Sequence, residues 1–237
     1  MKRAGQIIAA SAMILVTGLA SAHEAGEWVL RAGVGQVAPK SGNLNIGSID
    51  LGGGVSLDSA SIEVDDGTSL VLSATYMFTD NWALDILAAA PFKHDIDVKA
   101  SITAGGDTVA GSVPIGDTSH LPPTVSVQYH FSPGGQFQPY AGLGVNWTTF
   151  FDEGLTDDAI AVGFEDLSLS SSFGVAAQVG ADWMLGDRWL VNLDLRWINI
   201  ESDVKVTLDD GSGPFTGELG TVEIDPWVYQ LNVGYRF

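Results

Sequence analysis

Apolar and polar residues alternate along much of this chain with a period of two. In the stretch 28–35, for example, Trp28 and Leu30 share one face, while Val29 and Arg31 share the other. Successive side chains of a β-strand point to opposite faces, so each such stretch predicts a strand with two different faces. Strands are predicted within eight stretches: 28–35, 70–78, 82–89, 125–131, 140–147, 173–183, 191–197 and 227–237.

The connections between these strands are alternately short and long. Turn-sized pieces rich in Gly, Asp, Asn or Pro lie at 79–81, 132–136 and 185–187, and long connections lie at 38–69, 93–121, 152–166 and 199–223. Short turns at one end and long loops at the other are typical of outer-membrane barrels. We therefore predict an all-β fold, an eight-stranded antiparallel transmembrane β-barrel with short periplasmic turns and long extracellular loops.

Aromatic residues occupy both ends of the apolar faces. The set beside the short turns is Trp28, Phe78, Trp82, Phe131, Phe137, Trp183, Trp189 and Phe237. The set at the other end is Phe92, Trp147, Phe173, Trp197 and Trp227. About ten tilted strand residues cross the hydrocarbon layer, and Trp and Tyr prefer its two borders. A soluble sandwich would also alternate, but it would not require aromatics at both strand ends, so we expect these faces to contact lipid.

The first 22 residues have the pattern of an export signal. Lys2 and Arg3 precede an apolar stretch from Ile7 to Leu19, and Ala20-Ser21-Ala22 resembles a cleavage site. An N-terminal membrane anchor is the alternative, but it would need a longer apolar core of about 20 residues. We predict a signal peptide at 1–22 and a barrel domain at 23–237, placed in the outer membrane of a Gram-negative cell.

Composition narrows the function further. The chain has 237 residues, of which 46% are hydrophobic and 16% charged, which excludes a disordered protein. Its net charge of -19 makes nucleic acid an unfavourable partner. It has no cysteine, hence no disulfide and no thiolate metal site.

Most of the negative charge falls in the long connections, which hold 21 acidic residues and four lysines. Asp157-Asp158 and Asp209-Asp210-Gly211 offer oxygen ligands for calcium or magnesium. Neither has the spacing of an EF-hand loop, so a solvated acidic surface is favoured. We expect no cofactor and no dedicated metal site.

The inward faces of the predicted strands carry a balanced set of charges. These residues are Arg31, Arg196 and Arg236 against Asp85, Asp182 and Asp194. Because buried charges persist when they are paired, we expect ion pairs to plug the periplasmic half of the lumen, either as packing alone or as part of a gate. Inward glycines would make room for larger side chains. The outer half is less polar, and its candidate channel-lining residues are Leu87, Ala89, Ile198 and Val228.

Prolines mark the outer ends of the third and fourth predicted strands. Pro91 and the pair Pro122-Pro123 cannot donate backbone hydrogen bonds to neighbouring strands. Two interpretations remain open: a lateral opening in the wall towards the membrane, or strands that simply end where loops begin.

Catalytic residues are sparse. His94 and His120 are the histidines near the outer rim, Ser119 adjoins His120, and no Gly-x-Ser-x-Gly motif occurs. We therefore expect no enzyme activity.

Several segments resemble the OmpW family of small outer-membrane barrels, which includes the AlkL-type hydrocarbon importers. They are His23-Glu24-Ala25-Gly26, Ala90-Pro91-Phe92-Lys93-His94, His120-Leu121-Pro122-Pro123-Thr124, Tyr140 to Asn146, Thr148 to Phe151, Asp225-Pro226-Trp227 and Gly234-Tyr235-Arg236-Phe237. The resemblance implies a narrow apolar channel, open outside and closed towards the periplasm, that passes small hydrophobic molecules sideways into the membrane.

The resemblance also assigns individual roles. Leu87 matches a gate residue of the family's third strand, whereas Arg196 stands where the seventh strand carries an inward aromatic, so it would narrow or polarise the channel. Tyr235 and the terminal Phe237 resemble the signal read by the barrel-assembly machinery.

Two functions follow for testing. The first is passive uptake of small hydrophobic solutes through the lumen. The alternative is a non-transporting surface barrel whose acidic loops bind cations or an external receptor. In both, outer-membrane lipid and lipopolysaccharide are the expected surroundings.

Overall fold

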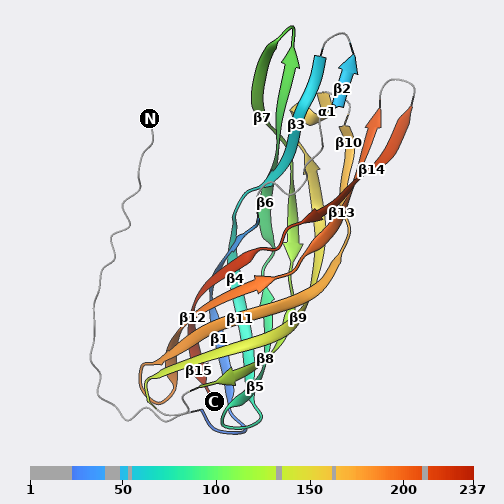
Figure 1. Cartoon of the computed structure of the whole chain (residues 1–237). Coiled ribbons are helices and arrows are strands. Elements are labelled where there is room, and N and C mark those ends of the chain that lie inside the picture. The colour runs from blue at the N-terminus through green and yellow to red at the C-terminus, as the bar shows by residue number, and fades with distance from the viewer. Residues whose placement is uncertain (1–22, 41–48, 53–54, 132–134, 162–163, 210–212) are drawn as a thin grey trace.

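A computed structural model describes residues 23–40, 49–52, 55–131, 135–161, 164–209 and 213–237, so the proposed signal peptide lies outside the described residues (Figure 1). The barrel strands are β1 (Trp28–Ala38), β4 (Gly67–Met77), β5 (Trp82–Ala89), β8 (Thr124–His130), β9 (Phe137–Leu155), β11 (Ser172–Met184), β12 (Trp189–Ile198) and β15 (Trp227–Arg236). The other elements are β2 (Ile49–Gly52), β3 (Val55–Val64), β6 (Phe92–Ala104), β7 (Asp107–Leu121), α1 (Asp157–Ala161), β10 (Phe164–Leu169), β13 (Glu201–Asp209) and β14 (Pro214–Glu223). In the described part of the chain, no helix has the length and apolarity needed to cross a membrane.

Among the described residues, eight antiparallel strands close into a barrel. Their order is β11-β12-β15-β1-β4-β5-β8-β9, and pairing of β9 with β11 closes the ring. Each of the eight strands therefore has a hydrogen-bonded neighbour on both sides, as a membrane-spanning sheet requires. The predicted eight-stranded barrel is confirmed.

The predicted inward and outward faces are also confirmed. On β1, Arg31 is 2% exposed while its neighbour Leu30 is 45% exposed. All eight aromatics of the turn-side girdle are exposed, and so are Trp147, Phe173 and Trp227 of the outer girdle. We define the membrane-spanning segments as the parts of the eight strands between these two girdles.

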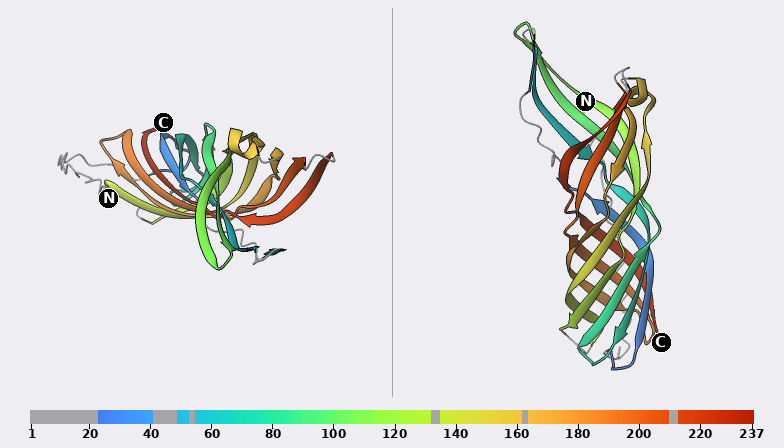
Figure 2. Two further views of the ribbon diagram at one scale, coloured as in Figure 1. Left: turned by 90° about the horizontal axis from the view of Figure 1, so that it is seen from above. Right: turned by 90° about the vertical axis from the view of Figure 1, so that its right-hand side faces the viewer.

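The long connections extend the wall of the barrel beyond the outer girdle. β7 pairs with the upper part of β9 and is followed by β6, β3 and β2, while β10, β13 and β14 form a second sheet. Figure 2 shows both groups rising from one end of the barrel, opposite the short turns. They form strands because alternation continues: on β6, His94 and Ile96 are buried while Lys93 and Asp95 are exposed.

One predicted orientation is wrong. Phe92, assigned to the outer girdle, is 1% exposed and lies inside. Even-numbered residues point outwards along β5, from Trp82 to Ala88, but inwards along β6. The segment containing Pro91 therefore shifts the alternation by one residue, and such a shift moves every later side chain to the other face.

Candidate functional site

The periplasmic half of the lumen is filled by a charged network centred on Arg31 and Asp182. The Arg31 guanidinium donates two hydrogen bonds to the Asp182 carboxylate, one of them from Nε to Oδ1 at 3.0 Å. Asn192 donates a further bond to Asp182 at 2.8 Å. Arg31 and Asp182 are 2% and 0% exposed, so this ion pair is buried inside the lumen.

A second ion pair crosses the lumen above the first. Arg196 on β12 lies 3.1 Å from Asp85 on β5, and these strands stand opposite each other in the barrel. Arg196 also donates to the Gln178 side chain and lies 3.6 Å from Asp194. Arg196 therefore has partners on both sides of the lumen, Asp85 on one side and Gln178 and Asp194 on the other.

The third inward arginine has a partner that the sequence analysis did not identify. Arg236 lies 3.4 Å from Glu27, which precedes β1. The three predicted arginines therefore do not pair one to one with the three predicted aspartates. Arg196 contacts two of these aspartates, and Arg236 contacts Glu27, which was not among the predicted residues.

Space for these long side chains comes partly from inward glycines, as predicted. The ring of Tyr140 is buried among the charges, and its hydroxyl donates to Asp194 at 2.8 Å. A Cβ atom on Gly180 would lie 2.4 Å from this ring, so a larger residue there would displace it.

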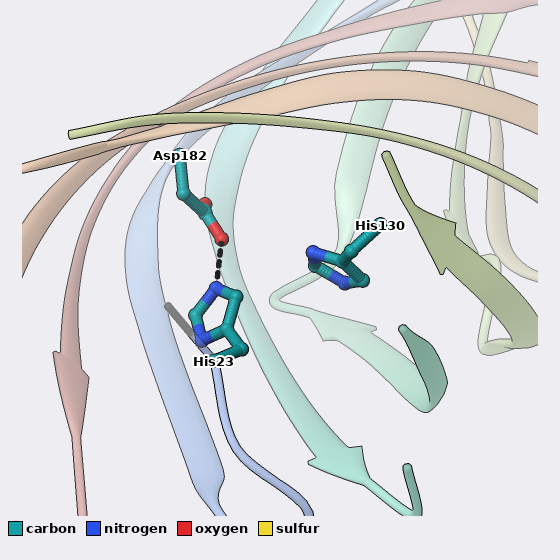
Figure 3. Close-up of side chains that lie close together, drawn as sticks. All are labelled: His23, His130 and Asp182. Atoms are coloured by element: carbon teal, nitrogen blue, oxygen red, sulfur yellow. Dashed lines mark hydrogen bonds and ion pairs between the residues drawn. The ribbon is translucent and has the colours of Figure 1, made fainter. Parts of the chain in front are cut away.

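At the periplasmic mouth, His23 and His130 join the network around Asp182 (Figure 3). His23 Nε2 lies 3.3 Å from Asp182 Oδ2, and the two imidazole rings meet edge to face with centroids 5.0 Å apart. Among the described residues, these three form the one cluster of His and carboxylate groups close enough to share a cation. The Arg31 guanidinium already neutralises Asp182, which disfavours a cation there.

The acidic pieces singled out in the sequence form no such cluster among the described residues. Asp157 and Asp158 lie exposed in the first turn of α1. Asp210 and Gly211 lie outside the described residues.

Above Arg196 the lumen is filled by apolar side chains. Leu87 and Val228 are 3% and 2% exposed and belong to one buried cluster, and Ala89 packs against it half-buried. Phe92 belongs to the same cluster, together with Val37, Val71, Ile96, Ile115, Ala159, Leu167, Ala176, Ile198, Ile200, Val204, Val222 and Ile224. The apolar channel-lining residues of the prediction are thus brought together with Phe92, whereas Arg196, predicted with them, lies in the charged network.

The three prolines lie where the wall of the barrel is interrupted. β5 pairs with β8 up to Leu87 and Thr124, and β6 pairs with β7 from Phe92 and His120 upwards. Among the described residues, no strand pairing joins 88–91 to 121–123. Each side instead bonds to its other neighbour: Ala90 N–H donates to Leu70 O at 2.9 Å, and Trp147 N–H donates to Pro123 O at 3.0 Å.

An apolar chamber lies at the upper end of the cluster, inside the extension, and the cluster residues Val37, Ile96, Ile200 and Ile224 form part of its wall. Its cavity volume is about 30 Å³, space for little more than a water molecule. Its wall is formed by Val37, Pro39, Val64, His94, Ile96, Thr118, His120, Phe150, Leu169, Ile200, Ile224 and Pro226. The stacked rings of Phe92 and His120, with centroids 5.5 Å apart, connect the chamber to the apolar cluster below it.

Two histidines of the chamber are held neutral. His94 and His120 stack with centroids 4.9 Å apart, beyond the outer girdle. Burial lowers the pKa of His94, and burial together with the neighbouring His94 lowers the pKa of His120 to about 3. Ser119 lies on the opposite face of β7 from His120, so these adjacent residues do not form a nucleophile and base pair.

The C-terminal strand closes the ring between β12 and β1. Tyr235 contacts Trp189 with ring centroids 5.0 Å apart, and the N–H of Phe237 donates to Trp28 O at 2.9 Å. The Phe237 side chain is 67% exposed on the lipid face.

Comparisons with known proteins agree with this architecture. The OmpW family profile matches residues 24–237. Outer membrane protein W of Escherichia coli is 38% identical over 233 residues, which cover 98% of each chain. The crystal structure of the outer membrane protein OprG from Pseudomonas aeruginosa matches with a TM-score of 0.75 and 34% identity, over 92% of this chain and 99% of that one. A Pseudomonas aeruginosa protein described as a dibenzothiophene metabolism operon protein is 24% identical over 90% of each chain.

Proposed function

The chain belongs to the OmpW family of outer-membrane barrels, and from that premise we propose that it takes up small hydrophobic molecules and releases them sideways into the membrane. A solute would enter the chamber from outside, pass Phe92 and Leu87, and leave through the interrupted wall at Pro91, Pro122 and Pro123.

The observation that carries this proposal is the position of the interruption. It lies directly above the level of the buried Arg196–Asp85 pair, and it adjoins the apolar cluster. Moving a hydrophobic solute past a layer of buried ion pairs and into water is unfavourable in free energy. Moving it into the hydrocarbon of the membrane, which lies beside the interruption, is favourable.

The apolar wall of the chamber supports the same substrate class. Apart from three polar side chains, the residues around it are aliphatic, aromatic or proline. The name of the dibenzothiophene metabolism operon protein refers to an apolar aromatic compound, which is consistent with this class.

Cross-linking the interruption tests the proposal. The chain has no cysteine, so Ala88→Cys with Pro123→Cys introduces one defined pair at two exposed positions facing across the gap. We expect a disulfide, or a bifunctional thiol reagent, to reduce uptake of an apolar solute to the rate of cells lacking the barrel. Reduction should restore uptake.

The matched control is Ala74→Cys with Ile86→Cys, a pair on the lipid face where β4 and β5 already bond to each other. Cross-linking there should leave uptake unchanged. Undiminished uptake through a barrel cross-linked at 88 and 123 would overturn sideways release. No uptake by the unmodified protein would favour the alternative, a surface barrel that acts through its acidic extension.

A further inference from the structure

A groove lies on the lipid face of the barrel at its outer border, on the side opposite the interrupted wall. It is formed by β11, β12, β15 and the end of β1, and its cavity volume is about 700 Å³. Its lining residues are Ala38, Pro39, Lys40, Ala177, Trp197, Asp225, Trp227 and Tyr229. Pockets of this size hold small molecules, so the groove has room for part of one lipid molecule.

One row of paired residues forms the base of the groove. Trp197 pairs with Ala177 on one side and with Trp227 on the other, and Trp227 pairs with Ala38. All four residues lie on the lipid-facing side of their strands. The two tryptophans are therefore neighbours in the row, and the small side chains at its two ends leave space beside them.

The groove continues down the lipid face towards the middle of the membrane. A second hollow, with a volume of about 430 Å³, shares Tyr229 with it. The outward apolar residues of this second hollow include Val179, Ala181, Leu193 and Leu195. Because the two hollows follow one another between the outer border and the hydrocarbon, they offer a track for an acyl chain.

Two opposite charges lie at the outer end of the groove. Lys40 follows Ala38 by two residues, and Asp225 precedes Trp227 by two residues, so both stand one step outside the row, at headgroup level. The backbone holds the two segments together, because Lys40 N–H donates to Ile224 O at 2.9 Å.

The Asp225 carboxylate is held in place by the end of β12. Its Oδ1 accepts a hydrogen bond from Asn199 Nδ2 at 3.0 Å and another from Ile200 N–H at 3.2 Å. Asp225 is half-buried and lines the groove. The groove therefore presents a fixed acceptor beside a lysine ammonium.

These charges match one kind of lipid headgroup. Lipid tails are as apolar as the groove, so apolar contact alone does not favour one lipid over another. The Lys40 ammonium attracts a lipid phosphate. The Asp225 carboxylate repels a phosphate that stands alone, but it accepts charge-assisted hydrogen bonds from a primary ammonium group. A phosphoethanolamine headgroup carries both of the complementary charges.

We propose that this groove binds one phospholipid with a phosphoethanolamine headgroup. Its phosphate lies against Lys40, its ammonium donates to Asp225, and one acyl chain follows Trp227 and Tyr229 down the lipid face. The inference is independent of the proposed uptake, because it concerns the outer surface of the wall opposite the interruption.

Native mass spectrometry counts the lipids that remain bound to the barrel. The full barrel is released from nanodiscs that contain equal amounts of phosphatidylethanolamine and phosphatidylglycerol with the same acyl chains. We expect phosphatidylethanolamine to be retained about tenfold more often, which corresponds to one hydrogen bond between charged groups. Ala177→Leu places a larger side chain in the groove and should remove this excess. Ala32→Leu, the same change at an exposed position on the lipid face of β1, is the matched control.

Two further variants separate the roles of the charges. Asp225→Asn keeps the oxygen that accepts from Asn199 and Ile200 but removes the negative charge. It should abolish the preference for phosphatidylethanolamine over phosphatidylglycerol. Lys40→Gln removes the charge that attracts phosphate and should lower retention of both lipids.

Fluorescence quenching within a bilayer gives a measurement free of detergent. Phosphatidylethanolamine with brominated acyl chains, at a low mole fraction in phosphatidylcholine vesicles, should quench Trp197 and Trp227 more strongly than brominated phosphatidylglycerol at the same fraction. The contribution of these two residues is the difference in emission between the natural protein and a Trp197→Phe, Trp227→Phe variant.

Three results would overturn the proposal. Equal retention and equal quenching by the two lipids would show that the headgroup is not recognised. Retention unchanged by Ala177→Leu would place the bound lipid elsewhere on the barrel. A mass of two chains without lipid, lost in Ala177→Leu, would identify the groove as a contact between two copies of this chain.

Discussion

Arg196 and Asp85 reach each other across the barrel, with 3.1 Å between Nη2 and Oδ2, from strands that face one another through the lumen. Both side chains are 2% exposed, so neither charge is screened by water. The pair joins opposite walls of the barrel at the level where the charged network meets the apolar cluster.

Breaking this pair on one side should therefore be costly. Arg196→Met leaves the Asp85 charge buried without its guanidinium, and loss of one partner of a buried pair typically costs about 3–5 kcal/mol. The free energy of unfolding, measured by urea titration in lipid vesicles, should fall by this amount. Combining Arg196→Met with Asp85→Leu removes both charges and should recover most of the loss. A double variant as unstable as the single one would contradict the coupling.

The lipid face should reject charge near the middle of the membrane. Leu193 is 62% exposed and lies midway between Trp189 and Trp197 on β12. Leu193→Arg should lower the free energy of unfolding in lipid by about 2–4 kcal/mol. Leu193→Ala, which adds no charge, provides the control. If the arginine variant were as stable as the alanine variant, the assignment of the inner and outer faces would be wrong.

Phe92 should control passage between the chamber and the apolar cluster. Phe92→Ala removes a fully buried ring, which typically costs about 3–5 kcal/mol and leaves a cavity along the proposed path. Uptake of an apolar solute by cells with equal amounts of folded protein should rise. Phe131→Ala, a lipid-facing aromatic beside a short turn, should not change uptake. Unchanged uptake in folded Phe92→Ala would place Phe92 outside the path.

Stability should decrease in acid because of His120. Burial and the neighbouring His94 lower its pKa to about 3, whereas an imidazole in the unfolded chain titrates near 6.5. Between these values the unfolded chain binds more protons, so the free energy of unfolding falls as pH decreases from about 6.5 towards 3, and this group adds no pH dependence above 6.5. At pH 5 the loss from His120 is about 2 kcal/mol.

His120→Phe keeps a ring beside Phe92 and removes the titrating group. Urea titrations at pH 7.5 and pH 5 should show a smaller acid loss in this variant than in the natural protein. Identical losses in the two proteins would show that His120 does not titrate as burial predicts.

Alternation predicted the strands, because lipid and lumen impose different residues on the two faces of every spanning strand, and the turn lengths and aromatic positions then distinguished a barrel from a sandwich. It identified the inward charges Arg31, Asp182 and Arg196 for the same reason. It failed at Phe92, because a one-residue shift beside Pro91 leaves no trace in composition or spacing.

Other features depend on contacts between distant parts of the chain. The partner of Arg236 is Glu27, which lies before the first strand, where no periodicity assigns a face. The meeting of His94 with Thr118 depends on the register of β6 against β7, which the sequence of either strand alone does not determine. The long connections were predicted to be extracellular loops, whereas in the structure they form the hairpins of the extension.

The interrupted wall beside Pro91 and Pro122-Pro123 separates two properties of the barrel. The backbone hydrogen bonds that hold the strands together lie above and below it, whereas the exit that we propose for solutes lies within it. Parting two strands of an unbroken barrel in hydrocarbon would rupture backbone hydrogen bonds, each costing several kcal/mol. Here the ladders below Leu87 and above Phe92 hold the strands together, and the span between them has no inter-strand ladder to break. The sideways exit that we propose through that span would require no separation of paired strands.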